Sequence, residues 1–394
     1  MTTLQPERQG TCWIVSMKYA PVMWNHARAF GQPLATAGQD VRYLLTESYQ
    51  WMTGPNRGDI ETIESPKTSN PLSSLARFLR RGGATQVRKA FTQSKPRLVI
   101  FVNFNQFVDR VVIREARRAN PEVRIILLIH EPYTEDKRVY GRKRATLLYF
   151  YEKLTLGLAR RADSLILPSR NAEETWQKHS GRLNRDTRMI PLPFVDESPS
   201  SEADRTHISF VGQIAHAHQK GLDLFLEMIE CASATHPNLR FRVVTGDDTQ
   251  ALLNQVSAEG RERLEVITGS PLSDEAIHEA LRSSLVVTIL QRRVMQSGTL
   301  PVAMMNGTPV LVTGLNGLTQ FVEDGKNGRV TALNSTAEER LDILQEMVSD
   351  LSNMSRAARR YYEDTFDSRN VAIHIPWLLG INENGTLSSL PIQE

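Results

Sequence analysis

The sequence predicts an α/β protein with two doubly wound, parallel-sheet domains. Short apolar runs typical of buried parallel strands alternate with segments long enough to form helices. This alternation lapses once near the middle of the chain and then restarts, which indicates two successive domains. At 394 residues the chain also has the length for two domains of roughly 150–200 residues each.

The first half of the chain contains five apolar runs with helix-sized segments between them. These runs occupy residues 11–17, 41–45, 97–103, 123–130 and 164–169. Residues 191–207, which follow, are rich in Pro, Ser and acidic residues, a composition typical of a linker. We therefore place an N-terminal domain at 1–195 and a linker at 196–206.

Five further apolar runs restart the pattern and define a second domain at 207–365. They lie at residues 207–214, 239–246, 264–269, 284–290 and 309–314. Both domains read as Rossmann-like, because strands and helices alternate in each of them. Residues 366–394 form a C-terminal extension, for which a return to the N-terminal domain and a frayed tail both stay open.

Charge divides the chain into a basic front half and an acidic back half. Residues 1–200 hold 31 Lys and Arg against 19 Asp and Glu, whereas residues 201–394 hold 16 against 25. A basic face attracts anionic ligands or lipid surfaces. The sequence has no apolar run of about 18 residues and no signal-peptide pattern at its N-terminus. We expect a cytoplasmic protein, with peripheral attachment to the inner face of a membrane as an option.

The start of the second domain has the pattern of a phosphate-binding turn. Residues 207–229 read as a strand, a glycine turn at Gly212 and a helix that opens near Lys220. Gly212 would let a phosphate approach the backbone, and Lys220 would place a positive charge on it. A plain strand–helix turn with a solvated lysine explains the same residues, so both interpretations stay open.

A second pattern lies at residues 296–330, where two short helices each follow a strand. Ser297 or Thr299 can cap the first helix, and Pro301 suits its first turn because proline has no N–H to leave unbonded. The backbone amides from Gly298 onward would then point toward the ends of the strands. The turn at 314–317 opens the second short helix beside the first.

These two stretches carry a family resemblance. GTPVLVTGLNGLTQFVEDGKNGRV at 307–330 resembles the C-terminal signature of family 4 glycosyltransferases (glycosyl transferases group 1) of the GT-B fold. FVGQI at 210–214 and KGLDLFLE at 220–227 resemble the first strand, turn and helix of their donor domain. The resemblance implies two domains that face each other across a cleft. It also implies sugar transfer, with retention, from a nucleotide diphosphate-sugar on the second domain to a saccharide or lipid-linked acceptor, in polysaccharide or glycoconjugate biosynthesis.

The resemblance also implies roles for individual residues of the second domain. Gly212 and Lys220 would meet the diphosphate, with Gln213 in the place of the family's usual arginine. Arg292 and Arg293 would add charge there or stay solvated. The remaining donor-binding candidates are Ser297, Gly298 and Thr299 for the sugar or diphosphate, and Thr268, Gly269 and Ser270 for the base. The resemblance implies no metal and no cofactor besides the donor substrate.

This chain departs from the family at its paired acidic residues. The family usually has two glutamates separated by seven residues, whereas the corresponding positions here are Val294 and Val302. The position of a later acidic residue of the family is Gln320 in this chain. Loss of a carboxylate that binds a sugar hydroxyl forfeits roughly 1.5–3 kcal/mol. The alternative to an active enzyme is therefore a catalytically impaired saccharide-binding or partner subunit. A nucleotide-sugar epimerase is a third, weaker alternative.

In the first domain, the candidate catalytic residues follow the strand predicted at 123–130. His130 ends this strand and Glu131 comes next, at the sheet edge where α/β proteins bind substrates. Family relatives often have a histidine beside the transferred sugar at this point, although a structural histidine is the plain alternative. Glu131 is the alternative base. Lys18, His26 and Asn105 are weaker candidates near other strand ends.

The basic excess of the first domain is concentrated in residues 74–97 and 135–144. In the first segment we expect Leu75, Phe78 and Leu79 on one helical face. Arg77, Arg80 and Arg81 would lie beside that face. Such a segment can lie on anionic lipid or bind an anionic acceptor, and the alternative is a core-facing helix with a solvated rim. We expect no nucleic-acid partner, because no aromatic platform accompanies the charge.

Overall fold

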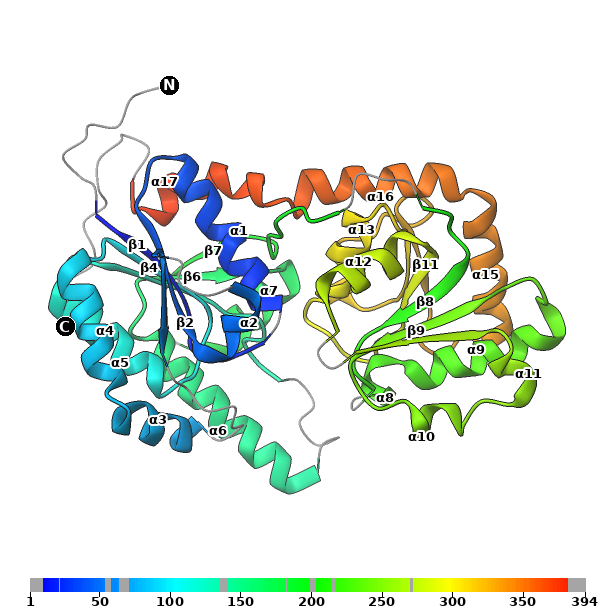
Figure 1. The fold of residues 1–394 in the computed structure, drawn as a ribbon, viewed down its shortest axis with the longest axis horizontal. Coiled ribbons are helices and arrows are strands. Elements are labelled where there is room, and N and C mark those ends of the chain that lie inside the picture. The colour runs from blue at the N-terminus through cyan, green and yellow to red at the C-terminus, as the bar shows by residue number, and fades with distance from the viewer. Residues whose placement is uncertain are drawn as a thin grey trace. The chain divides into compact units, whose positions relative to one another are not determined.

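The computed structural model divides the chain into two compact units (Figure 1). It describes residues 10–381 except 21, 54–57, 64–70, 135–140, 182, 199–202, 215–216 and 270–271. Unit 1 contains the described residues up to Val195 together with those from Asp367 onward, and unit 2 contains those from Asp196 to Phe366. Each unit is built on one parallel sheet, which confirms the predicted fold class.

The sheet of unit 1 has seven parallel strands in the order β3-β2-β1-β4-β5-β6-β7. They are β1 (Cys12–Ser16), β2 (Val41–Thr46), β3 (Ile60–Ile63), β4 (Leu98–Asn103), β5 (Arg124–Leu128), β6 (Ser164–Leu167) and β7 (Asp186–Met189). The five predicted apolar runs form β1, β2, β4, β5 and β6. The two strands that the sequence pattern missed, β3 and β7, lie at the edges of the sheet. Because β1, β5 and β6 are buried along their whole length, they read as continuous apolar runs.

Helices cover this sheet and complete a core around Trp13, Phe101 and Leu127. They are α1 (Val22–Thr36), η2 (Glu47–Tyr49), α2 (Gln50–Thr53), α3 (Pro71–Arg80), α4 (Gly83–Ser94), α5 (Val108–Ala119), α6 (Gly141–Ala159) and α7 (Arg170–His179). Local sequence sets where some of them begin. The Ser169 side chain, for example, accepts a hydrogen bond of 3.0 Å from the Ala172 amide and so caps α7.

The sheet of unit 2 has six parallel strands in the order β10-β9-β8-β11-β12-β13. They are β8 (His207–Val211), β9 (Phe241–Thr245), β10 (Leu264–Thr268), β11 (Ser284–Ile289), β12 (Val310–Thr313) and β13 (Gly328–Thr331). The five predicted runs form the first five, and the edge strand β13 was missed. Residues before the strands therefore gather at one edge of this sheet, and residues after them gather at the opposite edge.

The helices of unit 2 connect these strands. They are α8 (Ala217–Lys220), α9 (Leu222–Thr235), α10 (Gln250–Leu253), α11 (Ala258–Arg261), α12 (Asp274–Arg282), α13 (Thr299–Met305), α14 (Asn316–Thr319), α15 (Ala337–Ser349) and α16 (Leu351–Thr365). A capping box formed by Thr336 and Glu339 starts α15. Apolar residues of α9 and α15, including Phe225, Leu341 and Leu344, pack into the core of the unit.

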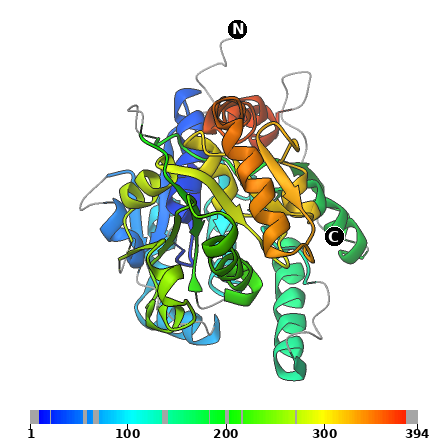
Figure 2. The same ribbon diagram turned by 90° about the vertical axis from the view of Figure 1, so that its right-hand side faces the viewer.

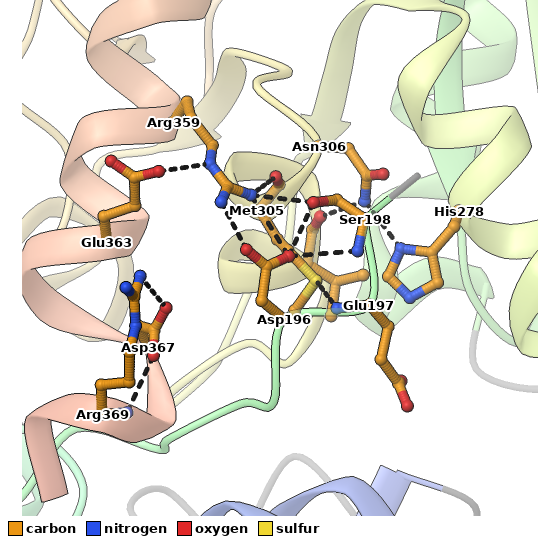
Figure 3. Close-up of polar contacts among 11 residues, drawn as sticks. Asp196, Glu197, Ser198, His278, Met305, Asn306, Arg359, Glu363, Asp367 and Arg369 are labelled. Atoms are coloured by element: carbon orange, nitrogen blue, oxygen red, sulfur yellow. Dashed lines mark hydrogen bonds and ion pairs between the residues drawn. The ribbon is translucent and has the colours of Figure 1, made fainter. Parts of the chain in front are cut away.

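The predicted linker is tied to unit 2 at both of its described ends. At the first end, Arg359 of α16 forms an ion pair with Asp196 and donates to Ser198 Oγ at 2.9 Å (Figure 3). At the other end, Arg205 donates to the Ser284 carbonyl and to Thr308 Oγ1, both at 2.7 Å. The segment is thus partly ordered by side-chain contacts that its Pro- and Ser-rich composition does not predict.

After α16 the chain returns to unit 1. The Ser368 amide donates to the Phe194 carbonyl at 2.8 Å, and two short helices follow, η5 (Ser368–His374) and α17 (Ile375–Leu378). η5 contacts α1. Trp377 Nε1 donates to Asp186 of the edge strand β7 at 2.8 Å, and its ring lies 5.4 Å from the Arg124 guanidinium. The described part of the C-terminal extension therefore belongs to the packing of unit 1.

One backbone contact fixes the turn between α8 and α9 in unit 2. Gly221 has a φ of +75°, and a Cβ at this position would lie 1.9 Å from the Leu290 carbonyl oxygen, just after β11. The neighbouring Arg292 amide also donates to the Gln219 carbonyl at 3.0 Å. Only a residue without a Cβ permits this approach, so glycine is required at 221.

Replacement of Trp377 by alanine should lower the stability of unit 1 by about 2–3 kcal/mol. The change removes a half-buried aromatic ring and leaves Asp186 without this donor. The measurement is urea unfolding followed by tryptophan fluorescence, since all five tryptophans lie in unit 1 and four remain in the variant. Ile373→Ala is the matched control, because Ile373 is 75% exposed on the same segment and its loss should change stability by less than about 0.5 kcal/mol. Equal stability of the two variants would contradict the docking of this segment.

Replacement of Gly221 by alanine should destabilise unit 2 by about 3–5 kcal/mol, since it combines a left-handed φ with a clash against backbone. Gly325→Ala is the control in the same unit. Gly325 has a φ of +80° with nothing within 4 Å of a Cβ, so it should cost only about 1–2 kcal/mol. Unfolding followed by circular dichroism measures both effects. If the two variants unfolded at the same midpoint, the contact between residue 221 and the Leu290 carbonyl would not constrain the turn.

Candidate functional site

The candidate site lies at the carboxyl edge of the sheet of unit 2. Gly212 follows β8, Gly269 follows β10, and the segment 290–298 connects β11 to α13. β8 lies between β9 and β11, so the turns after β8 and β11 are one strand spacing apart, roughly 4.8 Å. β10 lies two strands away from β8 on the other side. The edge therefore brings the predicted diphosphate-binding residues together, with the predicted base-binding residues farther along.

The turn after β8 is held by an aspartate that the sequence analysis missed. The Gly212 amide donates to the Val244 carbonyl of β9 at 3.1 Å, and the Ile214 amide donates to the Asp247 carboxylate at 2.6 Å. Gln213 is exposed between them. Asp247 in turn follows β9, and the Thr-Gly-Asp-Asp run after that strand was the available sequence signal. Its carboxylate keeps the backbone of this turn in place.

Lys220 ends α8 immediately before Gly221 and is half-buried. The contact between Gly221 and the Leu290 carbonyl places Lys220 next to the exit of β11. Its position is therefore set by the backbone, as a phosphate-binding lysine beside a helix start requires.

Arg292 is engaged inside unit 2. Its guanidinium lies 2.7 Å from Asp223 of α9 and also donates to the His218 carbonyl. Burial alone would raise the pKa of Asp223, but hydrogen bonds from Arg292 and His218 hold it below its ordinary value. Arg292 therefore joins the β11 exit to α9, a structural task that the sequence interpretation did not foresee. Arg293 is half-buried beside it.

The segment before α13 places its amides at the edge. Ser297 is buried, and its hydroxyl lies 3.4 Å from Nε2 of Gln291, whose carbonyl accepts a bond of 2.6 Å from Thr313. Gly298 is the residue before α13, and nothing lies within 4 Å of where its Cβ would be. Thr299 begins α13 and is half-buried. Space is thus left beside the first amides of this helix.

The positions of the family's acidic residues are apolar or amide in this chain. Val294 and Val302 are half-buried, and a Cβ at Gly317 of α14 would lie 2.4 Å from the Val294 carbonyl oxygen. The Gln320 carbonyl accepts from Tyr361 at 3.4 Å. Gln296 is a residue that the sequence analysis missed. Both polar atoms of its side chain are buried and have no hydrogen-bond partner among the described residues.

The residues predicted to meet the base lie at the strand end of β10. Thr268 is exposed and Gly269 is half-buried, and the Gly269 carbonyl oxygen would lie 3.2 Å from a Cβ at Gly246. The ends of β9 and β10 are thus close together. Ser270 lies outside the described residues.

In unit 1, two histidines lie close to each other at the carboxyl side of the sheet. His130 Nε2 lies 2.9 Å from the Val102 carbonyl, and its ring centroid is 6.1 Å from that of His26. Burial lowers the pKa of His130, so its imidazole is neutral at pH 7. His26 is buried against the Pro193 carbonyl at 2.8 Å, and burial followed by the nearby His130 lowers its pKa to about 3. His26 is thus a packed structural residue, whereas His130 is half-buried.

The other unit 1 candidates differ in accessibility. Glu131 and Lys18 are exposed. Asn105 is buried, and its side-chain oxygen accepts from the Phe107 and Val108 amides at 3.2 Å, so it caps the start of α5. Asn105 therefore has a structural task.

The basic segment 74–97 lies on two helices, α3 and α4. Gly82, with a φ of +75°, separates α3 from α4. Leu75, Phe78 and Leu79 share one face of α3 as expected, since they are three and four residues apart on one helix. Phe78 is fully buried and Leu75 packs against the core, whereas Leu79 is 48% exposed. Arg77, Arg80 and Arg81 are exposed at the end of α3. Residues 135–140 of the second basic segment lie outside the described residues.

Among the residues that the structure describes, no group of three or more His, Cys, Asp or Glu could hold a metal ion. None of the helices in the same part of the chain combines the length and the apolar character needed to span a membrane.

Comparisons with known proteins agree with this architecture. Residues 205–350 match the family described as Glycosyl transferases group 1. A comparison with curated protein sequences found no match. Solved structures give extensive matches over both units. Sucrose-phosphate synthase from Thermosynechococcus elongatus aligns with a TM-score of 0.69 at 17% identity, over 94% of this chain and 98% of that one.

Two other similar structures were determined with nucleotide ligands. HepE from Anabaena, in complex with UDP-glucose, aligns with a TM-score of 0.69 at 14% identity, over 94% of this chain and 100% of that one. The pneumococcal O-GlcNAc transferase GtfA, in complex with UDP and GlcNAc, aligns with a TM-score of 0.65 at 13% identity, over 95% and 99%. Residues 205–350 thus match the glycosyl transferases group 1 family, and the chain has the two-domain GT-B fold of these solved structures.

Proposed function

We propose that the chain transfers a sugar from a nucleotide diphosphate-sugar to a saccharide or lipid-linked acceptor, in polysaccharide or glycoconjugate biosynthesis. The observation that carries the proposal is the convergence of Gly212, Lys220 and the first amides of α13 at one sheet edge. These are the groups that a diphosphate needs, because backbone amides and a lysine can stabilise the charge of the leaving group. By this account the reaction requires no metal. The UDP and UDP-glucose complexes of similar structures support such a donor.

The acceptor side of the proposal rests on unit 1. His130 is the group that we assign to the transferred sugar or the acceptor, because its neutral imidazole can exchange hydrogen bonds with hydroxyls at pH 7. Glu131 is the second candidate. Retention of configuration follows from the family resemblance. NMR of the anomeric centre of the product, after reaction with a panel of nucleotide sugars, tests both the donor and the stereochemistry.

Gln296 is our candidate for a group that takes over a task of the absent glutamates. Its buried amide has no partner among the described residues, a costly arrangement that a sugar or ribose hydroxyl would relieve. Gln296 lies two residues after Val294 and next to Ser297, in the segment that connects β11 to α13. An amide makes weaker bonds to hydroxyls than a carboxylate does, so slower turnover than in relatives is consistent with this replacement.

The second candidate function is a binding or partner subunit without transfer activity. Val294, Val302 and Gln320 favour it, because no carboxylate stands at these positions. Saturable binding of a nucleotide sugar without transfer to any acceptor supports this function, and measured turnover excludes it.

Lys220→Ala should weaken binding of the nucleoside diphosphate by roughly 10–150-fold, the range of one charge-assisted hydrogen bond to phosphate. Calorimetry with UDP and other nucleoside diphosphates measures it. Lys326→Ala is the matched control, since Lys326 is exposed, pairs with Glu323 and precedes β13 at the opposite end of the strands. Unchanged affinity of the Lys220 variant for nucleoside diphosphates would show that this lysine does not bind the phosphates.

We also propose that unit 1 attaches to anionic membranes. Two helices of unit 1, α3 and α6, combine exposed apolar residues with cations. On α3, Leu72 and Leu79 are 56% and 48% exposed, and the arginines lie at the end of the helix. On α6, Leu147, Tyr149 and Phe150 are each about half exposed, and its first turn carries three exposed cations. The start of α6 projects from unit 1 in both views (Figures 1 and 2). Apolar residues beside cations suit the interface of an acidic bilayer.

Serine at Arg77, Arg80 and Arg81 should weaken binding to vesicles with acidic lipid by about 3 kcal/mol at low salt, at about 1 kcal/mol per cation. Vesicle sedimentation measures this, and binding should fall as salt screens the attraction beyond about 8 Å. Donor affinity and cooperative melting should stay unchanged. The matched control removes three exposed cations of unit 2: Arg261, Lys326 and Arg360. Equal loss in both triple variants, or binding that is independent of acidic lipid, would refute the attachment surface.

A further inference from the structure

A cavity in unit 2 lies at the end of the sheet opposite to the proposed donor site. Its volume is about 1050 Å³. Its walls include Arg205 just before β8, Arg282 just before β11 and Gly307 just before β12. The strands are parallel, so these residues mark the amino edge of the sheet. The cavity is therefore separate from Gly212, Lys220 and the other residues that follow the strands. We call it the amino-edge pocket.

The amino-edge pocket is strongly basic. Its described lining contains the carboxylate of Asp196 and four arginines, a formal charge of +3. The arginines are Arg205, Arg282, Arg356 and Arg359. This concentration is unusual because the second half of the chain is acidic as a whole. A basic cavity in an acidic half raises the local concentration of small anions.

Arg205 carries a positive charge in the wall of the pocket and is half-buried. Its guanidinium donates to four uncharged oxygens, namely Thr308 Oγ1 and the carbonyls of Ser284, Asn306 and Gly307. Burial and then the nearby Arg282 lower its pKa, which means that its charged form gains little from the surrounding protein. An anion in the pocket would supply the attraction that these neutral acceptors do not.

Arg356 brings a second guanidinium with uncharged partners. It donates to Ser352 Oγ at 2.8 Å and to Asn353 Oδ1 at 2.6 Å, all on α16, and it is exposed. The first residues of this fifteen-residue helix, Leu351 and Ser352, also line the pocket, so the positive end of the helix faces it. Asp350 lies beside this end, with its carboxylate held by the Asn353 amide at 2.5 Å.

A buried hydroxyl adds a polar group to the same wall. Ser355 Oγ is inaccessible to solvent and has no hydrogen-bond partner among the described residues, although Ser355 lines the pocket. Arg359 contributes differently, because it is already paired with Asp196 and Glu363 and bonds the Met305 carbonyl at 2.6 Å (Figure 3). Arg359 therefore holds the pocket together. Arg282 is paired with Glu279 of α12, whereas Arg205 and Arg356 donate to uncharged acceptors. These three arginines are the groups that meet a ligand.

We propose that the amino-edge pocket binds the phosphate group of a small phosphorylated molecule. Arginine guanidiniums match phosphate oxygens in pairs, and serine hydroxyls and helix amides are the usual additional donors. The volume suits a ligand of the size of a sugar phosphate. This site goes beyond the proposed transfer reaction, because its residues lie at the other end of the strands.

Calorimetry of the full chain with inorganic phosphate and with a hexose monophosphate, at fixed ionic strength in chloride, tests the proposal. Wild-type protein should bind, and Arg356→Ser and Arg282→Ser should each weaken binding about tenfold or more. Arg356→Lys should recover part of the affinity, because it keeps the charge but not the paired geometry. Arg360→Ser is the matched control, since Arg360 is exposed on the same helix but does not line the pocket.

The outcomes separate the possible ligands and sites. Tighter binding of the hexose monophosphate than of phosphate supports a phosphorylated sugar, and equal affinity supports recognition of the phosphate alone. Absence of binding, or affinity that Arg356→Ser and Arg282→Ser leave unchanged, would overturn the proposal. Loss of binding in Lys220→Ala with full binding in both arginine variants would also overturn it, because the anion would then occupy the donor edge. Melting curves of each variant show that any loss is not unfolding.

Discussion

The carboxyl edge of unit 2 depends on how closely backbone segments approach one another after β11. Gly221 lets the turn before α9 lie against the Leu290 carbonyl, and Gly317 lets α14 lie against the carbonyls of Val294 and Met295. The segment 290–298 is thus held from two sides by contacts that a Cβ would prevent. The ion pair of Arg292 with Asp223 adds a third attachment. Because this segment carries Gln296 and leads to the amides of α13, the chemistry of the edge follows from backbone packing.

A parallel sheet has two chemically different ends, and unit 2 makes different use of them. At the carboxyl end, the polar groups are mainly backbone amides, hydroxyls and one lysine, and one of the two arginines there, Arg292, is neutralised by Asp223. At the amino end, four arginines surround a cavity. Arg205 and Arg356 donate to uncharged acceptors, whereas Arg282 and Arg359 are paired with carboxylates. Amide dipoles stabilise charge that develops during a reaction, whereas permanent guanidinium charges favour a ligand that is already an anion. The two ends are therefore suited to different tasks.

The sequence was informative where burial imposes a simple pattern. Continuous apolar runs located ten strands, but β3, β7 and β13 carry polar or charged residues at half-exposed sheet edges and leave no such run. The sequence motif was sufficient to place Gly212 and Lys220 in the turn and the helix start that follow β8. The engagement of Arg292 could not be predicted, because Asp223 lies 69 residues earlier. Nor could the unpartnered amide of Gln296, which depends on its surroundings. The break between α3 and α4 in the basic segment is visible in the sequence as Gly82-Gly83.

The return of the chain to unit 1 has a consequence for synthesis on the ribosome. The last described residues of unit 1 are made only after the whole of unit 2, at roughly 5–20 residues per second. For roughly 10 to 35 seconds, the nascent unit 1 therefore lacks the contact between α1 and η5. Asp186 on the edge strand β7 lacks its hydrogen bond from Trp377 during the same time. During that interval the exposed strand is a potential site for wrong pairing. A chaperone that shields this surface would act before release of the chain. We therefore expect the expression yield to depend on how long α1 and β7 stay uncovered during synthesis.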